Sequence, residues 1–391
     1  MQTLRSTFVS LVTVLLGIGV LMVFSSSMTA RPSDFEQVYL SRHLLYLAIA
    51  VALAFVVSSI PAEWLLRLAP TFFAGTILLL LAVLIPGLGV RVNGSQRWLR
   101  LGVMSFQPSE LAKVTLPLCL CWLLEQRRAG GVLRGMAGAP PGELRPWLHR
   151  TGEVLAPIGL AALLVLVEPD LGTAAFLTLI GGMTLFLSGW PIRDFALGLG
   201  AVVPLAAGVI ALKPYQLRRL EGFVQVWTDF RNAPYQVKQS LTTLGAGGTV
   251  GVGLGKGWQK LSFLPEANTD FVFAVVGEEL GLAGTLSVLG VWSALLVTGL
   301  VLLRGVAADR PRHVVGTVLL TQLVLQALVN IAVVTAMLPP KGIAHPLLSA
   351  GGSSLLGSLL AIGVFLSMTK SQEAMEASLQ APLASSSRQA A

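Results

Sequence analysis

The chain has 391 residues, of which 54% are hydrophobic and only 12% are charged. A soluble globular domain carries roughly 25% charged residues, so this composition excludes a soluble enzyme with one anchor and predicts a polytopic membrane protein. The formal net charge of +8 would suggest nucleic-acid binding in a soluble protein. With so few charges, their positions are more informative than their sum, and we expect no nucleic-acid partner.

A helix crosses the hydrocarbon core of a bilayer in about 20 apolar residues. Ten apolar runs of this kind predict an all-α polytopic membrane protein with ten transmembrane helices. The predicted spans are 7–25, 43–60, 68–88, 108–124, 152–168, 171–189, 195–212, 271–303, 314–337 and 350–368. The run 271–303 is long for one span, and it fits either one tilted helix or a helix with a re-entrant start.

Basic residues predict the orientation of this bundle. An even number of spans places both termini on one side, together with the loops after the fourth and eighth spans, where arginines are frequent. The positive-inside rule makes that side cytoplasmic. We expect 1–370 to form a single membrane domain and the segment 371–391, rich in Ser, Gln and Ala, to be a disordered cytoplasmic tail.

A large loop, 213–270, then lies on the outer side, between the seventh and eighth spans. Its segment from Leu217 to Trp227 has apolar residues at helical spacing with Arg218 and Arg219 between them. This pattern is typical of an amphipathic helix on the membrane surface, and a substrate role is an equal alternative. A glycine-rich stretch at 245–257 matches neither a Walker A loop nor GxGxxG, so no nucleotide is expected.

Asp270 stands where this polar loop meets the apolar run 271–303. A carboxylate at a membrane boundary can be partly desolvated, and it can then act as a base or a metal ligand. The alternative is a helix N-cap, a position at which Asp is favoured. The two cysteines, Cys119 and Cys121, lie in an apolar run and are interpreted as buried hydrophobic residues rather than as a disulfide or a metal pair.

Three further polar groups fall on the outer side. Arg97 precedes Glu110 and Lys113, which share a helix face at a spacing of three and predict either a structural salt bridge or a substrate role. The turn 168–173 holds two acidic residues, and the Pro-, Gly- and Ser-rich segment 338–354 is typical of irregular backbone lining a cavity. We expect a common outward-facing cavity formed by these groups, the glycine-rich stretch and Asp270.

Taken together, these motifs resemble the SEDS family of peptidoglycan polymerases, which includes FtsW, RodA and SpoVE. The matching strings occur in family order along nearly the whole chain, and the family fold that they imply is a ten-helix bundle. They are Asn93-Gly94, Arg97-Trp98, Gln107-Pro108-Ser109-Glu110 with Lys113, Pro169-Asp170-Leu171-Gly172-Thr173, Tyr235-Gln236, Gln239-Ser240, Gly253-Leu254-Gly255, Lys260, Leu264-Pro265-Glu266, Thr269-Asp270-Phe271, Gly277-Glu278-Glu279-Leu280-Gly281 and Gly351-Gly352-Ser353-Ser354.

The resemblance implies a glycosyltransferase that polymerises lipid II at the outer face of the bacterial cytoplasmic membrane. Asp270 is the family-matched base, acting directly or through a divalent ion such as Mg or Mn, and the lipid diphosphate removes the need for a nucleotide. The partners implied are a class B penicillin-binding protein, which is a transpeptidase, and other division proteins. The implied substrate-binding residues are Arg97, Glu110, Lys113, Arg218, Arg219, Lys260, Ser353 and Ser354.

The motifs Pro340-Lys341-Gly342 and Gly277-Glu278-Glu279 resemble the division branch of the family, and they imply a location at the division septum. Three alternatives remain open at this point. They are a RodA-like elongation polymerase, a flippase that transports lipid-linked precursor, and a division scaffold without catalytic activity.

Overall fold

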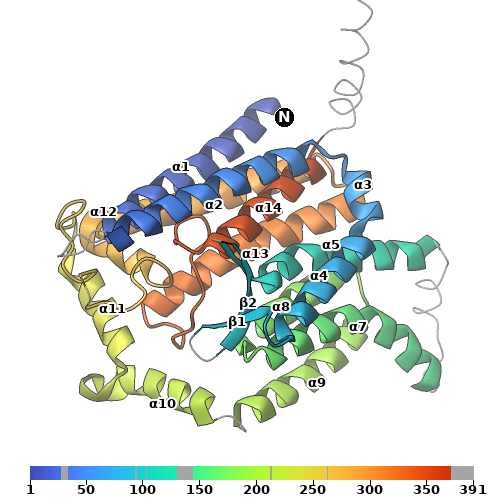
Figure 1. The fold of residues 1–391 in the computed structure, drawn as a ribbon. Coiled ribbons are helices and arrows are strands. Elements are labelled where there is room, and N and C mark those ends of the chain that lie inside the picture. Colours follow the sequence, from blue (N-terminus) through green and yellow to red (C-terminus); the bar gives the residue numbers. More distant parts are fainter. Residues whose placement is uncertain are drawn as a thin grey trace, which may run out of the picture.

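The computed structural model describes residues 1–27, 34–92, 95–102, 104–129, 144–211, 214–261 and 263–370. Helices dominate these ranges, and one small sheet packs against α4 (Figure 1). The predicted tail 371–391 lies outside the described residues.

Each predicted apolar span coincides with a helix. The described helices are α1 (Gln2–Ser26), α2 (Asp34–Ser59), α3 (Ala62–Arg67), α4 (Ala69–Leu84), α5 (Pro108–Ala129), α7 (Leu144–Val167), α8 (Leu171–Leu187), α9 (Ile192–Ala211), α10 (Pro214–Thr228), the 3₁₀ turn η1 (Phe230–Asn232), α11 (Tyr235–Ala246), α12 (Val272–Arg304), α13 (Arg310–Val334) and α14 (Gly352–Met368). Among the described residues, α1, α2, α12 and α13 are long and apolar enough to cross a membrane, while α4, α7, α8 and α14 are apolar but shorter. The helical membrane fold is therefore confirmed, and the count of ten spans stays a prediction.

The sequence pattern did not predict a small antiparallel sheet between α4 and α5. Its strands are β1 (Gly89–Val92), β2 (Ser95–Leu101) and β3 (Met104–Phe106), in the order β1-β2-β3. The expected helix over 68–88 is wrong at its end, because the residue before Pro86 is extended and α4 stops at Leu84. The Gln96 amide donates to the Val83 carbonyl at 2.8 Å, which fixes the sheet at the end of α4.

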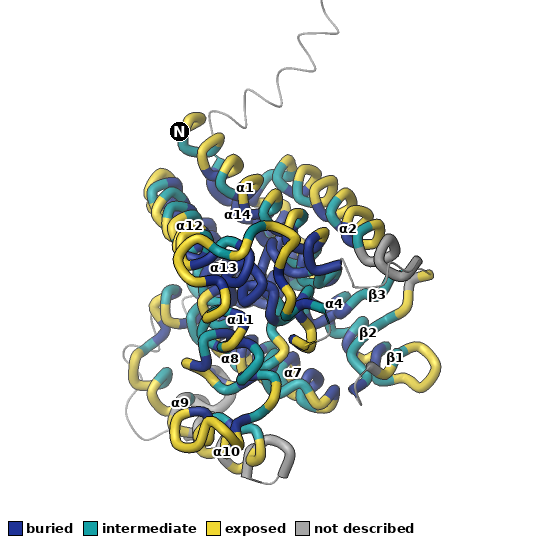
Figure 2. Tube along the Cα trace, turned by 90° about the vertical axis from the view of Figure 1, so that its left-hand side faces the viewer, coloured by how far each residue is buried: buried dark blue, intermediate teal, exposed yellow. Residues whose placement is uncertain are grey.

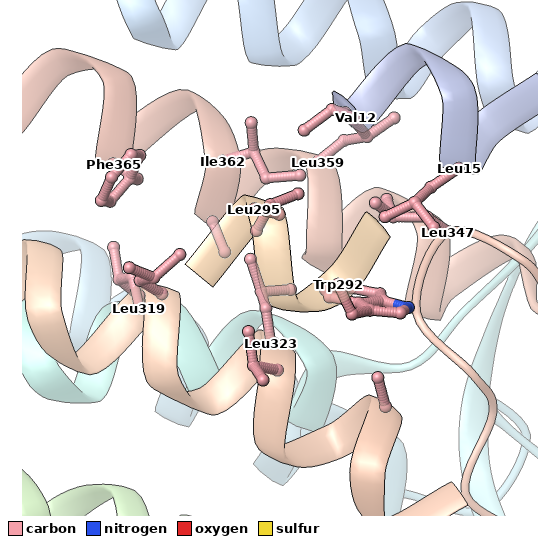
Figure 3. Close-up of a cluster of buried hydrophobic side chains, with 14 of the residues drawn as sticks. Val12, Leu15, Trp292, Leu295, Leu319, Leu323, Leu347, Leu359, Ile362 and Phe365 are labelled. Atoms are coloured by element: carbon pink, nitrogen blue, oxygen red, sulfur yellow. The ribbon is translucent and has the colours of Figure 1, made fainter. Parts of the chain in front are cut away.

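The main hydrophobic core surrounds α13, which packs against α5, α8, α12 and α14. Figure 3 shows Leu319 and Leu323 of α13 in this core, with Trp292 and Leu295 of α12 close by. Buried residues gather at the centre of the bundle, and exposed residues follow the outer helices (Figure 2). Many of the exposed side chains on α1, α2 and α12 are large and apolar, as expected for surfaces that face lipid. Both cysteines are buried and free, as predicted.

Several arginines lie together at one end of the bundle. Arg5 donates to the Leu366 carbonyl at 3.1 Å, Arg312 to the Met368 carbonyl at 3.0 Å and Arg310 to the Ser188 carbonyl at 2.7 Å. These contacts bring the start of α1, the start of α13 and the ends of α8 and α14 to the same end. The sequence places these arginines on the predicted cytoplasmic side, and the first residues of α5, α8, α12 and α14 lie toward the other end.

The long run 271–303 is broken at Gly281 and is not one continuous helix, and its re-entrant start stays a prediction. At Gly281 the backbone leaves the helical region, with φ 66° and ψ −163°, a conformation that glycine adopts most readily. The glycine-rich stretch pairs with this break, because Val252 N–H donates to the Glu278 carbonyl and Leu282 N–H donates to the Gly248 carbonyl. A Cβ at Gly281 would overlap the Gly251 backbone.

The predicted amphipathic helix in the outer loop is confirmed as α10. Its apolar residues Leu217, Leu220, Val224 and Trp227 are all exposed, which suits contact with an apolar environment. Its position on the membrane surface stays a prediction.

Candidate active site

A cavity of about 940 Å³ opens where four separate parts of the chain meet, and single residues of α10, α11 and α13 (Arg219, Gln236 and Gln326) complete its lining. They are the segment from β2 to the start of α5, the turn before α8, residues 266–271, and the region formed by 340–344 with the start of α14. The predicted common cavity is therefore confirmed for four of the five polar groups, and the glycine-rich stretch 245–257 does not line it. Its charged lining residues are Arg97, Glu110, Lys113, Asp170, Arg219, Glu266, Asp270 and Lys341.

Asp270 lies in a turn directly before α12. The N-cap of α12 is Phe271, and no side chain caps this helix, so the N-cap alternative for Asp270 is wrong. A Cβ added to Gly342 would lie 2.8 Å from Asp270 Oδ2. Only glycine therefore leaves the carboxylate in its present place on the cavity wall.

The environment of Asp270 raises the pKa of its carboxyl group toward neutral pH. Burial, reinforced by the negative charge of Glu266 and opposed by Arg219, raises the pKa of Asp270 to about 7. A carboxylate with a pKa near the working pH is well suited to accept a proton during a reaction. The electrostatics of the cavity therefore favour a base at this position.

Lys113 lies at the part of the cavity nearest the bundle core. Its ammonium contacts Glu110 Oε1 at 2.6 Å and Gln326 Oε1 at 3.1 Å, and it lies 5.5 Å from the centre of the Phe176 ring. The predicted salt bridge is therefore formed, and both of its members also line the cavity. Glu110 thereby holds the Lys113 ammonium in one place.

The cavity lining carries a second group of charges. Arg97 contacts Asp170 Oδ2 at 3.3 Å, and Asp170 also caps α8, because its Oδ1 accepts from Thr173 N–H at 3.0 Å. Lys341 lines the same cavity, although it was not among the substrate-binding residues implied by the sequence. Burial lowers the pKa of Lys341, with Asp170 opposing this shift and Arg219 adding to it. The sequence signal that could have identified Lys341 is its position between Pro340 and Gly342, in a segment predicted to line a cavity.

The structure does not bring every predicted residue to this cavity. The Lys260 side chain is only 1% exposed, and its ammonium pairs with Glu279 Oε1 at 2.6 Å beneath the break in α12. Ser353 is buried and donates to the Ser105 carbonyl at 3.0 Å, whereas Ser354 lines the cavity. Arg218 is exposed and does not line the cavity, whereas its neighbour Arg219 does. We therefore leave Lys260, Ser353 and Arg218 out of the site.

The donor set around Asp270 fits a shared divalent ion rather than a closed metal site. The described residues hold no group of three or more His, Cys, Asp or Glu side chains that could bind a metal ion. Asp270 and Glu266 nevertheless both line the cavity and interact electrostatically. Mg²⁺ is commonly held by one or two carboxylates together with substrate phosphates, so Asp270 and Glu266 are the residues that could hold such an ion.

Comparison with known proteins assigns the chain to a family. A family model described as "Cell cycle protein", which covers FtsW, RodA and SpoVE, matches residues 6–374. The probable peptidoglycan glycosyltransferase FtsW of Coxiella burnetii is 39% identical over an alignment of 359 residues that covers 90% of this chain and 92% of that protein. The protein of the same name from Nitrosococcus halophilus is 40% identical over an alignment of 365 residues that covers 90% of this chain and 88% of that protein.

Solved structures share the fold. One is described as "Structural coordination of polymerization and crosslinking by a peptidoglycan synthase complex", and a chain in it is 28% identical with a TM-score of 0.72, covering 93% of this chain and 96% of that one. The rod shape determining protein RodA of Thermus thermophilus is 27% identical with a TM-score of 0.64, covering 93% of this chain and 95% of that one. The chain therefore belongs to the FtsW/RodA/SpoVE family of cell cycle proteins.

Proposed function

We propose that the protein is a peptidoglycan glycosyltransferase that polymerises lipid II into glycan strands. The observation that carries this proposal is Asp270, a carboxylate with a pKa near 7, on the wall of a cavity that also presents Arg97, Lys341 and Arg219. Relatives covering nearly the whole chain are named as probable peptidoglycan glycosyltransferases, which supports the same reaction here.

Each residue type in the cavity suits one part of this reaction. The donor is a sugar on a lipid-linked diphosphate, and the acceptor is a sugar hydroxyl of a second lipid II. Asp270 accepts the proton of that hydroxyl while the hydroxyl oxygen bonds to the anomeric carbon of the donor. The bond from that carbon to the diphosphate breaks, and the diphosphate leaves with the electron pair. A single displacement of this kind inverts the configuration at the anomeric carbon.

The basic residues stabilise the charge on the departing diphosphate. Arg97, Arg219 and Lys341 lie on the same cavity as Asp270, and charge-assisted hydrogen bonds to phosphate are among the stronger ones in proteins. A divalent ion at Asp270 and Glu266, Mg²⁺ or Mn²⁺, would neutralise further phosphate charge. No nucleotide is required, because the diphosphate already activates the donor.

Replacing Lys341 tests the role of these cations. We expect Lys341→Ala to lower kcat/KM for lipid II by about 10-fold or more, since a hydrogen bond to a charged group contributes about 1.5–3 kcal/mol. Lys341→Arg keeps the charge and should recover most of this loss. Initial polymerisation rates over a range of lipid II concentrations provide the measurement, and an unchanged kcat/KM in Lys341→Ala would remove Lys341 from the substrate site.

The pKa of Asp270 sets an expected pH dependence. As the pH falls through about 7, the carboxyl becomes protonated and the rate should fall about tenfold per pH unit. Above that range the rate should level off.

Glu266→Gln removes the neighbouring negative charge, so the midpoint of the pH profile should move to lower pH. Added Mg²⁺ should move the midpoint in the same direction if it binds these carboxylates. Initial rates from about pH 5.5 to about pH 9 test this, and a profile flat through neutral pH would contradict Asp270 as the base.

We also propose that the protein acts in the bacterial cytoplasmic membrane with both termini in the cytoplasm, and that it serves cell division at the septum. The arginines gathered at one end of the bundle support this orientation, and the FtsW names of its relatives support the division role. A class B penicillin-binding protein is the expected partner, because a related chain belongs to a peptidoglycan synthase complex with polymerisation and crosslinking activities.

One experiment separates this function from transport of the same lipid. The purified protein is reconstituted in liposomes with labelled lipid II, and both glycan polymer and lipid translocated across the bilayer are measured. Polymer formation that depends on Asp270 is the expected result. Translocation without polymer would favour a flippase, and an intact complex with the transpeptidase but no dependence on Asp270 would favour a scaffold.

A further inference from the structure

Asn330 joins the two backbone segments that flank Asp270. Its side chain lies on α13 and is buried, with 1% of the residue exposed. Nδ2 donates to the Asp270 carbonyl and to the Ile343 carbonyl, both at 2.7 Å. One side chain thus holds the segment that carries Asp270 against the segment that carries Gly342, whose backbone lies beside the Asp270 carboxylate.

The two residues before Asp270 are held in a similar way. Ser349 Oγ donates to the Thr269 carbonyl at 2.5 Å, and Ala350 N–H donates to the Asn268 carbonyl at 2.8 Å. Three consecutive carbonyls therefore each accept a hydrogen bond from another part of the chain. The turn that carries Asp270 is closed by bonds from Thr269 N–H and Phe271 N–H to the Glu266 carbonyl, and the three outside bonds attach this turn to the rest of the bundle.

We propose that Asn330, supported by Ser349, is a positioning residue that fixes Asp270 for catalysis. This inference rests on the proposed function, in which Asp270 is the base. A base acts only within hydrogen-bond reach of the proton that it accepts, and a displacement of about 1 Å can lower a rate by about 10²-fold. Asn330 is not among the residues that line the cavity, and its side chain acts through its bond to the backbone carbonyl of Asp270.

Steady-state kinetics distinguish positioning from a purely structural role. In the full-length protein in liposomes, we expect Asn330→Ala and the isosteric Asn330→Asp to lower kcat for lipid II polymerisation by about 10- to 100-fold. The KM should change by a smaller factor than kcat, because Asn330 and Ser349 bond to backbone carbonyls and not to the side chains of Arg97, Arg219 or Lys341. Ser349→Ala should lower kcat in the same manner, and Ser349→Thr should restore much of it by returning the hydroxyl.

Gln322 provides a matched control, because it is another buried polar residue of α13 located about two helical turns from Asn330. Gln322→Ala should alter thermal stability without a selective fall in kcat. Ser349 lies on a different segment, so its variants test the proposal even if replacement of Asn330 prevents folding.

The outcomes separate this inference from the function on which it rests. Wild-type activity together with an inactive Asp270→Asn variant supports the base. If the Asn330 and Ser349 variants then fold and keep the wild-type kcat, the positioning role is overturned and the base is not. Variants that lose thermal stability but keep kcat have the same consequence. Wild-type activity that survives in Asp270→Asn overturns both proposals.

Discussion

Replacing Asp270 with Asn is expected to lower lipid II polymerisation by about 10³-fold or more, at the upper end of what a general base contributes. The variant has nearly the same shape, but it cannot accept the hydroxyl proton. Asp270 lies on the cavity wall beside Gly342. The initial rate of polymer formation is the measurement.

Stability measurements show whether this loss is chemical. Because burial raises the pKa of Asp270 above its ordinary value, the folded state disfavours the charged carboxylate, and the neutral Asn should leave thermal stability unchanged or increase it above pH 7. Asp229→Asn, at an exposed position in the same outer loop, is the matched control and should keep wild-type activity. Full activity in Asp270→Asn would exclude Asp270 as the base.

Removing one partner of the buried Lys260–Glu279 pair is expected to destabilise the protein by about 3–5 kcal/mol, because it leaves an uncompensated buried charge. Glu279 also accepts hydrogen bonds from Ser25 Oγ and Gly255 N–H, so the pair joins α1, the glycine-rich stretch and the break in α12. Lys260→Met and Glu279→Gln should each lower the midpoint of thermal unfolding in detergent.

The double variant Lys260→Met/Glu279→Gln separates a structural role from substrate binding. Both charges are then absent, so most of the lost stability should return. Because Lys260 lies outside the cavity lining, the folded double variant should polymerise lipid II at close to the wild-type rate. A stable double variant without activity would instead return Lys260 to the substrate site.

Local sequence signals were sufficient for part of this site. The change from a polar loop to an apolar run located Asp270, and the spacing of three between Glu110 and Lys113 predicted their salt bridge, which forms at 2.6 Å. Hydropathy located the helices because a span must bury about 20 apolar residues in lipid. Each of these features depends on neighbouring residues of one segment.

Contacts between distant segments could not be predicted in this way. Lys260 and Lys341 are both lysines in glycine-containing outer loops, but Lys260 meets Ser25 and Glu279 in the interior, whereas Lys341 reaches the cavity. Asn330 resembles a tolerated polar residue in an apolar helix, and nothing near it in the chain indicates its bond to Asp270. The predicted span 68–88 ran too far because its hydropathy continues beyond the point where Pro86 ends the helix.

The central claim is that the Asp270 cavity of this chain forms glycan strands from lipid II. Its most direct test is the amount of glycan polymer made by the purified wild-type protein and by Asp270→Asn in the same liposomes, with and without a class B transpeptidase. The account predicts polymer from the wild type and almost none from the variant. Equal amounts of polymer from both proteins would contradict it.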